Sequence, residues 1–382
     1  MDSVRGNPFR GYEVSGVAIS TGEQEILTAE KINVGVSLMA LITGAPPVSL
    51  IEIEGFDSNV ERMNQLLSKI ETGQGEGEIP VKKVRLLDSS FGTPFARAAI
   101  RDIALTFDKT RINADLDLDI QDVPLRGDVD VDIKEGAVFL EKMDLNVGDG
   151  NISAMGGLRP DLSLQGKMEN LDVPRLASLW PGIDPDNFKG LFSTDLTAEG
   201  TWEAPNISGS LSFSGEKIAG IPLKSAEARW RYQQNRLDIA DMKALLMGFP
   251  LEGHLAFVFE EDTPGRIMVD LQGSEADLSQ LGELDPRFAD LTGRVNEFTL
   301  NLKGDINEPT GSISFKAEKL AFRGYSLSGT DVNADIKKGL VDLKGKTSLM
   351  GANISLGGNV TDFPGNARAD IQGSIRSLSL KE

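Results

Sequence analysis

The chain has 382 residues, enough for two or three ordinary domains or for one long repetitive domain. Its formal net charge of −19 argues against binding to nucleic-acid phosphates and against electrostatic docking on anionic lipid surfaces. Cysteine is absent, which excludes disulfides, thiolate metal sites and cysteine nucleophiles. Histidine occurs once, as His254.

No stretch approaches the ~18–20 consecutive apolar residues that a membrane-spanning helix needs. No signal-peptide pattern precedes a cleavage site. Residues Met1–Gly6 have the character of an arbitrary start. We therefore expect a membrane-anchoring or export segment to precede them in the full-length protein. The alternative is a complete cytosolic protein.

Residues 1–78 are expected to form a small α/β segment. The alternation in Lys31–Val36 predicts a strand. Ser58 with Glu61 forms a capping box, which predicts an amphipathic helix over about 58–72. The Gly- and Glu-rich stretch 73–78 then predicts a flexible linker. A phosphate-binding loop is disfavoured there, because the stretch leaves a helix and its glutamates would repel phosphate.

From Ile79 onward the pattern is almost entirely strand and turn. Apolar residues alternate with aspartates over 112–120 and again over 125–133, which predicts strands with one apolar and one solvated face. The aspartate runs resemble a calcium loop. An EF-hand loop needs Gly at position six and Glu at position twelve, but counting from Asp115 these positions hold Ile120 and Arg126. The runs are therefore interpreted as a solvated sheet face, and no metal site is predicted.

Several landmarks recur at a spacing of roughly 100 residues, which indicates internal repeats. The alternating strand Pro205–Gly215 returns at Pro309–Ala317, and Leu164-Gln165-Gly166 returns at Leu271-Gln272-Gly273. Short helical segments are expected at the joints, over 173–180 and 277–281. These landmarks divide the chain into an N-terminal segment and three repeats, at 1–78, 79–166, 167–273 and 274–382.

Antiparallel strands with one apolar face must hide that face, in a sandwich, in a barrel or in a trough. The repeat favours a stack extended along one direction, and the small aliphatic lining favours a trough. The predicted fold is mainly β: a long, curved antiparallel sheet folded into an elongated groove (a β-taco), with a few short helices. The predicted groove-lining residues are Ile112, Leu116, Leu118, Val129, Val131, Ile207, Leu211, Phe213, Phe298, Leu300, Ile313 and Phe315.

These residues resemble a known superfamily. The run Thr28–Val34, followed by Ile51-Glu52-Ile53-Glu54-Gly55, resembles the opening of AsmA-like proteins just after their membrane helix. Gly200, Pro205 and Gly209, with the following 220–226, resemble repeats of the same superfamily, including TamB. The motifs are degenerate and cover nearly the whole chain, so they point to a superfamily and not to one member.

The resemblance implies a protein anchored in the inner membrane of diderm bacteria by one N-terminal helix and extending into the periplasm. It implies β-groove repeats that carry phospholipids or other acyl lipids toward the outer membrane, and in some members an outer-membrane partner protein. This sequence departs from the pattern because it lacks the anchoring helix.

Three functions follow as hypotheses. The first is carriage of lipid acyl chains along the groove. The second is a structural or assembly scaffold for outer-membrane protein biogenesis, in which exposed strand edges pair with a partner chain. The third is an enzyme, which is disfavoured because no catalytic triad can be built around His254, and no nucleophile elbow or Walker loop is present. No catalytic residue, cofactor or nucleic-acid partner is predicted, and His254 is expected at a surface or strand edge.

Overall fold

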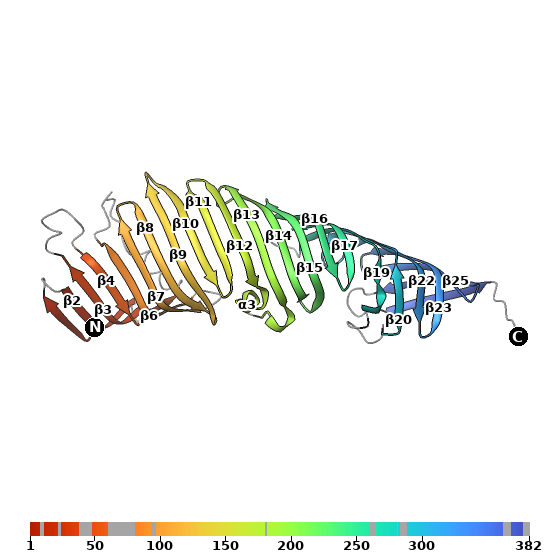
Figure 1. The fold of residues 1–382 in the computed structure, drawn as a ribbon, viewed down its shortest axis with the longest axis horizontal. Helices are drawn as coiled ribbons and strands as arrows, with labels where there is room; N and C mark the ends of the chain where they lie inside the picture. Colours follow the sequence, from red (N-terminus) through yellow and green to blue (C-terminus); the bar gives the residue numbers. More distant parts are fainter. Residues whose placement is uncertain are drawn as a thin grey trace. The chain divides into compact units, whose positions relative to one another are not determined.

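The computed structural model describes residues 1–7, 11–21, 24–37, 48–59, 81–92, 97–179, 182–259, 265–280, 282, 289–361 and 368–376. Within these residues the protein is almost entirely β, and its 26 strands belong to one mixed sheet (Figure 1). The chain divides into two compact units. The first comprises Met1–Asp186 and Thr197–Trp202, and the second comprises Asn187–Leu196 and Glu203–Glu382.

The first unit is built from strands that, after β5, pair with the next strand in chain order up to β12. Its strands are β1 (Ser3–Asn7), β2 (Gly11–Thr21), β3 (Gln24–Val36), β4 (Val48–Glu54), β5 (Asp57–Asn59), β6 (Lys83–Gly92), β7 (Arg97–Asp108), β8 (Arg111–Ile120), β9 (Val123–Lys134), β10 (Ala137–Val147), β11 (Gly150–Arg159) and β12 (Leu162–Asp172).

The second unit is also built from antiparallel neighbours, but here β18 pairs with β21 past the short strands β19 and β20 (Figure 1). Its strands are β14 (Pro205–Ile218), β15 (Ile221–Gln233), β16 (Arg236–Leu246), β17 (Phe249–Val258), β18 (Arg266–Gly273), β19 (Ala276–Asp277), β20 (Leu291–Val295), β21 (Glu297–Asp305), β22 (Thr310–Phe322), β23 (Tyr325–Lys337), β24 (Leu340–Leu349), β25 (Ala352–Thr361) and β26 (Arg368–Arg376). Strand β13 (Lys189–Gly200) contributes residues to both units.

Helical structure is sparse among the described residues. Besides the single helical residue Gly282, it consists of α3 (Val173–Ser178) and two 3₁₀ turns, η1 (Pro185–Asn187) and η2 (Leu278–Gln280). The carboxylate of Asp172 caps α3 by accepting a hydrogen bond from the Arg175 amide at 3.0 Å, which confirms the helix predicted at this joint. In the part of the chain that the structure describes, no helix has the length and apolar character needed to cross a bilayer.

The sheet is mixed and not wholly antiparallel, which corrects the prediction. Strands β4 and β5 both run parallel to β6, with Ile51 opposite Val84 and Ser58 opposite Phe91. The register offset is the same for both, so β4 and β5 act as one strand interrupted at Gly55. A parallel pair needs a crossover connection, and alternation within a strand does not report the direction of its neighbour.

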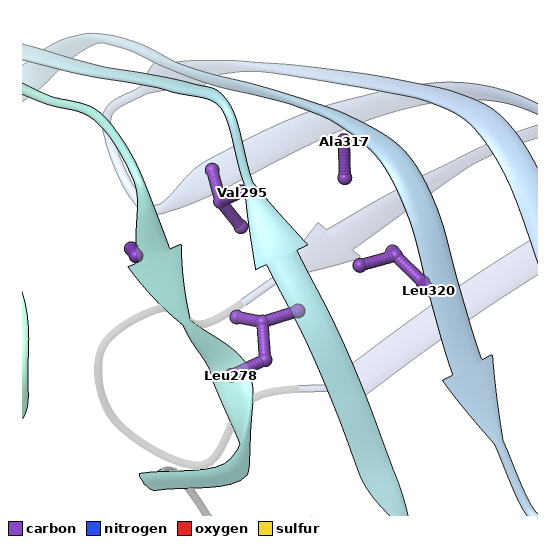
Figure 2. Packing of buried hydrophobic residues seen from close by; sticks show 5 residues of the cluster. Leu278, Val295, Ala317 and Leu320 are labelled. Atoms are coloured by element: carbon purple, nitrogen blue, oxygen red, sulfur yellow. The ribbon is translucent and has the colours of Figure 1, made fainter.

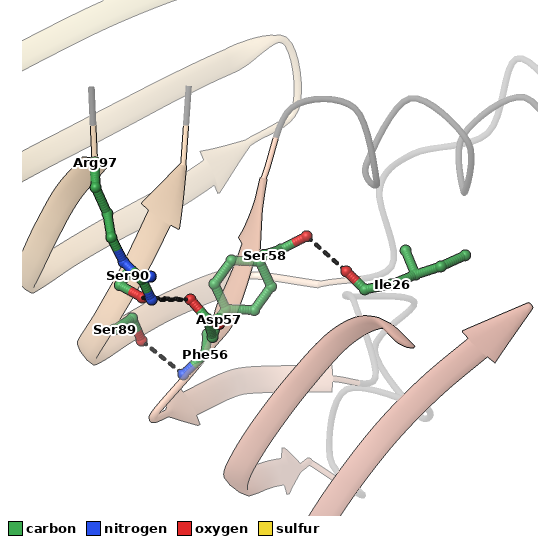
Figure 3. Close-up of polar contacts among 7 residues, drawn as sticks. All are labelled: Ile26, Phe56, Asp57, Ser58, Ser89, Ser90 and Arg97. Carbon is green, nitrogen blue, oxygen red and sulfur yellow. Dashed lines mark hydrogen bonds and ion pairs between the residues drawn. The ribbon is translucent and has the colours of Figure 1, made fainter. Parts of the chain in front are cut away.

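Ser58 is predicted to cap a helix, and this prediction is wrong. Ser58 lies in β5 and is buried, and its hydroxyl donates to the carbonyl oxygen of Ile26 at 2.9 Å (Figure 3). Next to it the amide of Phe56 donates to the Ser89 hydroxyl at 3.1 Å. Both bonds satisfy polar groups where the strand is interrupted. The remainder of the predicted helix and the linker 73–78 lie outside the described residues.

Some of the described strands carry one residue more than a neighbouring strand. Such β-bulges lie at Arg101 in β7, Glu141 in β10, near Asp241 in β16 and near Gly329 in β23. Each bulge changes which alternate residues face one side, and the apolar positions in the sequence change with it. In β16, for example, Ile239 precedes the bulge and Met242 follows it. The bulges therefore keep the apolar residues on one face while bending the strand.

Fully buried clusters are small and local. In the second unit Ala276, Leu278, Val295, Ala317 and Leu320 pack together, as Figure 2 shows, with Phe249, Phe298, Phe315 and Leu327 around them. In the first unit Val123, Val147 and Leu171 pack together under Leu176 and Leu179 at the end of β12. Each cluster lies at a strand interruption or a strand end, and most of the apolar side chains lie outside them.

Candidate functional site

The first unit carries a continuous row of apolar side chains across its strands. Residues directly opposite each other in neighbouring strands share a face. Val84 lies opposite Leu105, Leu105 opposite Ala114, Ala114 opposite Val129, and Val129 opposite Met143. The predicted lining residues Ile112 and Val131 are also directly opposite each other. We call this side the apolar face of the first unit.

The second unit carries an equivalent row. Leu271 lies opposite Leu300, Leu300 opposite Ile313, Ile313 opposite Ala334, and Ala334 opposite Leu343. Phe298 and Phe315 face each other in the next row. At β14 and β15, Ile207 lies opposite Tyr232, Leu211 opposite Ala228 and Phe213 opposite Ala226. We call this side the apolar face of the second unit.

Most of the predicted lining residues are neither fully buried nor fully exposed. Ten of the twelve are half-buried, and only Leu118 and Phe213 are buried, at 9% and 4% exposure. A second sheet packed on this face would bury such side chains fully. Half-burial is instead what one layer of neighbouring side chains provides. The apolar faces therefore retain accessible apolar surface among the described residues.

Three of the predicted lining residues pack against other residues of the same chain. Phe298 and Phe315 pack against the buried cluster of Leu278 and Val295. The ring of Phe213 lies so close to Gly190 that a Cβ atom on that glycine would come within 2.6 Å of ring atoms Cε2 and Cζ. These three rings contribute to local core packing, while Leu211, Leu300 and Ile313 stay outside the buried clusters.

The opposite face is polar, and its charges pair across strands. The Asp117 carboxylate accepts from the Arg101 guanidinium at 2.5 Å and from Arg126 at 3.2 Å. Lys142 donates to Asp128 at 2.8 Å, and this hydrogen bond raises the pKa of the Lys142 ammonium. The other aspartates of the two runs thus lie on a solvated face, but the expectation is wrong for Asp132, whose side chain is only 1% exposed. Among the described residues no three His, Asp or Glu side chains lie close enough together to hold a metal ion.

His254 lies in β17, which pairs with β16 on one side and β18 on the other, so it is not a strand-edge residue. Its side chain is 36% exposed, and its Nε2 lies 3.5 Å from Oδ1 of Asp238. A hydrogen bond from Arg236 is the main cause that lowers the pKa of Asp238, and His254 adds to it. The imidazole therefore belongs to a polar cluster with Arg236 and Asp238.

The register also adds residues that sequence reasoning did not select. Tyr232 lies opposite Ile207, and Ala334 lies opposite Ile313, so both share the apolar face of the second unit. Each alternates with polar neighbours in its own strand, so the sequence contains this signal.

Comparison with known proteins found no matching family model, no matching curated protein and no matching solved structure.

Proposed function

We propose that this protein carries lipid acyl chains along its apolar faces, with the bent strands of each unit forming the walls of an elongated groove. The observation that carries the proposal is the half-burial of ten of the twelve predicted lining residues on faces set by register. Half-buried apolar rows of this extent still leave apolar surface in water, and covering it with an acyl chain recovers about 0.8 kcal/mol per buried CH₂ group.

The polar face supports the same proposal. Paired charges such as Arg101 with Asp117 and Lys316 with Glu297 keep one side of the strands hydrated. A carrier of this kind needs no catalytic residue, and the proposal assigns none. The resemblance to AsmA-like proteins extends the proposal to phospholipid transfer in the periplasm, from an inner membrane to an outer membrane. Each of the expected ~100-residue repeats would then form a segment of groove.

The test is photo-crosslinking at a matched pair of positions. Leu300 lies on the apolar face of β21, and its neighbour Thr299 lies on the polar face, where its hydroxyl is 2.6 Å from that of Ser314. A benzophenone amino acid replaces either residue, and the protein is irradiated after expression in a diderm bacterium. We expect a lipid adduct, detected by mass spectrometry, at position 300 and none at position 299.

A charge placed at the same positions gives a second readout. We expect Leu300→Glu to reduce copurified lipid several-fold, because a carboxylate on the apolar face is desolvated by a bound chain. Thr299→Glu should leave it unchanged. The proposal would be overturned if no lipid copurified with the wild-type protein and no adduct formed at either position.

A second candidate function is supported by strand β26. All nine of its residues are exposed, Ile371 and Ile375 by 52% and 60%, and in the described residues it pairs only with β25. An edge of this kind can accept a strand from a partner protein. An assembly scaffold would be favoured if Ile375→Lys abolished capture of an outer-membrane protein while lipid recovery stayed at the wild-type level.

A further inference from the structure

Four two-residue turns lie at the same end of the strands in the second unit. Antiparallel strands reverse direction at alternate ends, and every pairing along the path from β14 to β18, and then from β21 to β25, is antiparallel. The turns that follow β14, β16, β22 and β24 therefore share one end. We call these four turns, with their closing residue pairs, the apolar rim: 218–221, 246–249, 322–325 and 349–352.

The apolar rim differs in composition from the rest of the chain. It contains Ile, Leu, Met, Phe, Tyr, Ala and Gly, one arginine and no aspartate or glutamate, although the whole chain has 58 acidic residues. The Arg323 guanidinium lies over the Phe322 ring, 5.3 Å from its centroid, and its Nε lies 3.8 Å from Oδ2 of Asp290, which compensates its charge. Met350 is 80% exposed and Tyr325 is 56% exposed. The rim therefore presents accessible apolar side chains without a net charge.

The opposite end of the same strands has turns of ordinary polar chemistry. The two-residue turns described there follow β15 and β23, and their central residues are Gln234 with Asn235 and Lys338 with Gly339. Polar residues and glycine are typical of turns that face water. A position in a turn does not, therefore, account for the apolar residues of the rim.

Two methionines of the rim occupy a backbone conformation that does not favour them. Met247 and Met350 have φ of +52° and +49°, and each is followed by a glycine at positive φ, Gly248 or Gly351. Positive φ at both central residues is the pattern of type I′ turns, in which Asn-Gly is preferred. Asparagine adopts positive φ more readily than methionine does. Because turn geometry does not explain methionine at these tips, we infer that the tips contact an apolar surface outside the chain.

We propose that the apolar rim docks on a lipid bilayer by inserting its side chains into the interfacial region of a zwitterionic membrane. The turns after β14 and β16 are two strands apart, roughly 10 Å, and so are those after β22 and β24, so the rim offers separate tips. A protein partner needs a contiguous patch of about 800 Å² on each side, whereas a fluid bilayer accepts separate apolar tips. Tyrosine, here Tyr325, is enriched where membrane meets water.

The charge of the chain selects the kind of lipid. A net charge of −19 repels anionic lipid surfaces, and the one cation of the rim is paired with Asp290. The attraction to the bilayer is therefore apolar and insensitive to salt. The inference goes beyond acyl-chain carriage and does not depend on it, because a docked rim needs no lipid inside a groove.

The first test is flotation of the full chain with phosphatidylcholine vesicles. The test variant is Met247→Asn with Met350→Asn, which removes two apolar tips and places the preferred Asn-Gly pair in each turn, so the fold is retained. The control is Gln121→Asn with Gln234→Asn, at two turn positions outside the rim with φ of +49° and +50°. We expect the test variant to float at least fivefold less than the wild type. The control should float as the wild type does, and high salt should not release the wild type.

The second test locates the contact. Because the chain has no cysteine, Met350→Cys and Gln234→Cys each provide a single site for a nitrobenzoxadiazole label. We expect vesicles to raise and blue-shift the fluorescence of the label at position 350 and to leave the label at position 234 unchanged. An equal response at both positions, or equal flotation of the wild type and the test variant, would overturn the docking.

A second copy of the chain is the competing occupant of the rim. If the wild type is a dimer in sedimentation velocity without lipid, the test variant is a monomer and neither floats, the rim is a self-association surface and bilayer docking is wrong. Failure of the docking is separable from failure of the proposed function. A wild type that does not float but still forms a lipid adduct at position 300 overturns the docking alone. A wild type that floats but gives neither adduct nor copurified lipid overturns acyl-chain carriage alone.

Discussion

The ring of Phe213 lies over the backbone of Gly190. A Cβ atom at Gly190 would come within 2.6 Å of ring atoms Cε2 and Cζ, and Phe213 is only 4% exposed. Gly190 has a φ of +155°, and the same Cβ atom would come within 2.8 Å of the Cα of Gly215. The absence of two side chains therefore creates the space that one aromatic ring fills, which ties β14 to the start of β13 without a second sheet.

This contact predicts that Phe213→Ala is strongly destabilising. Removing the buried ring should lower the free energy of unfolding by about 3–5 kcal/mol, since the glycine backbones leave no side chain to refill the cavity. Urea denaturation followed by circular dichroism measures the change. Leu191→Ala removes an apolar side chain that is 44% exposed and should cost less than about 1 kcal/mol. Similar losses in both variants would contradict the finding.

The bulge in β23 gives a second prediction. Val332, Ala334 and Ile336 face the residues of β22 in an unshifted pairing that also spans Leu327 on the other side of Gly329. Deleting Gly329 would leave Leu327 and Val332 four residues apart, so both keep the apolar face only if the pairs with β22 re-form around a one-residue offset. We expect the deletion to lower the free energy of unfolding by several kcal/mol, because this offset disturbs the packing of Ile336, which is 2% exposed.

Gly329→Ala is the matched control for the deletion. Gly329 has a φ of +59°, and an added Cβ would meet nothing within 4 Å, so only backbone strain of about 1–2 kcal/mol is expected. Denaturant midpoints of the two variants measure the difference. A deletion variant as stable as the alanine variant would mean that register does not depend on the bulge.

Much of this fold is predictable from alternation. The alternation of apolar and acidic residues predicts strands over 112–120 and 125–133, and the structure confirms them as β8 and β9. The helix after Asp172 follows from its position between two strand patterns. Direction is not predictable, since the parallel pairing of β5 with β6 depends on where the chain crosses over and not on local alternation.

Burial is also only partly predictable. Leu211 and Phe213 follow the same alternation in one strand. Phe213 is nevertheless buried, because its ring packs on the backbone of Gly190, whereas Leu211 is half-buried. The capping pattern at Ser58 is misleading because a serine hydroxyl can serve a strand equally well by donating to a distant carbonyl, here that of Ile26. Both outcomes depend on contacts more than 20 residues apart in sequence, which a local pattern does not contain.

A third prediction concerns acid. Hydrogen bonds from Arg85 to Asp102, at 2.9 and 2.5 Å, hold the pKa of the Asp102 carboxyl below its usual range. The Asp102 carboxylate therefore binds a proton less readily in the folded state than in the unfolded state, where the pKa of an aspartate is about 3.9. The stabilisation is present above pH of about 4 and is lost as the pH falls through the lower folded pKa.

Asp102→Asn tests this coupling. The variant should be less stable than the wild type at pH 7, and the difference should shrink as the pH is lowered below about 4, when the wild-type carboxylate becomes protonated. Urea titrations at pH 7, 4.5 and 3 measure it. Arg85→Gln should show the same convergence. A difference that stays constant down to pH 2.5 would show that the pair does not respond to acid. Both side chains are 37% exposed, so the effect is modest.

The last prediction concerns a buried carboxylate in β9. The Asp132 side chain is 1% exposed and pairs with the Lys134 ammonium, whereas its Oδ1 atom has no hydrogen-bond partner among the described residues. Hydrogen bonds from Lys134, and then from Thr110, lower the pKa of the Asp132 carboxyl. The lysine is 60% exposed, so it supplies charge to a carboxylate that water barely reaches. Removing Lys134 would leave that carboxylate without its counter-ion.

We therefore expect Lys134→Met to lower the thermal midpoint, and we expect Asp132→Asn in the same chain to restore most of the loss. The restoration is the diagnostic result, because a neutral amide carries no desolvated charge and needs no ammonium partner. Circular dichroism melts of the two single variants and the double variant measure the coupling. If the losses of thermal midpoint in the two single variants simply add in the double variant, the prediction is wrong. Lys134 would then stabilise β9 by packing alone and not as the counter-ion of Asp132.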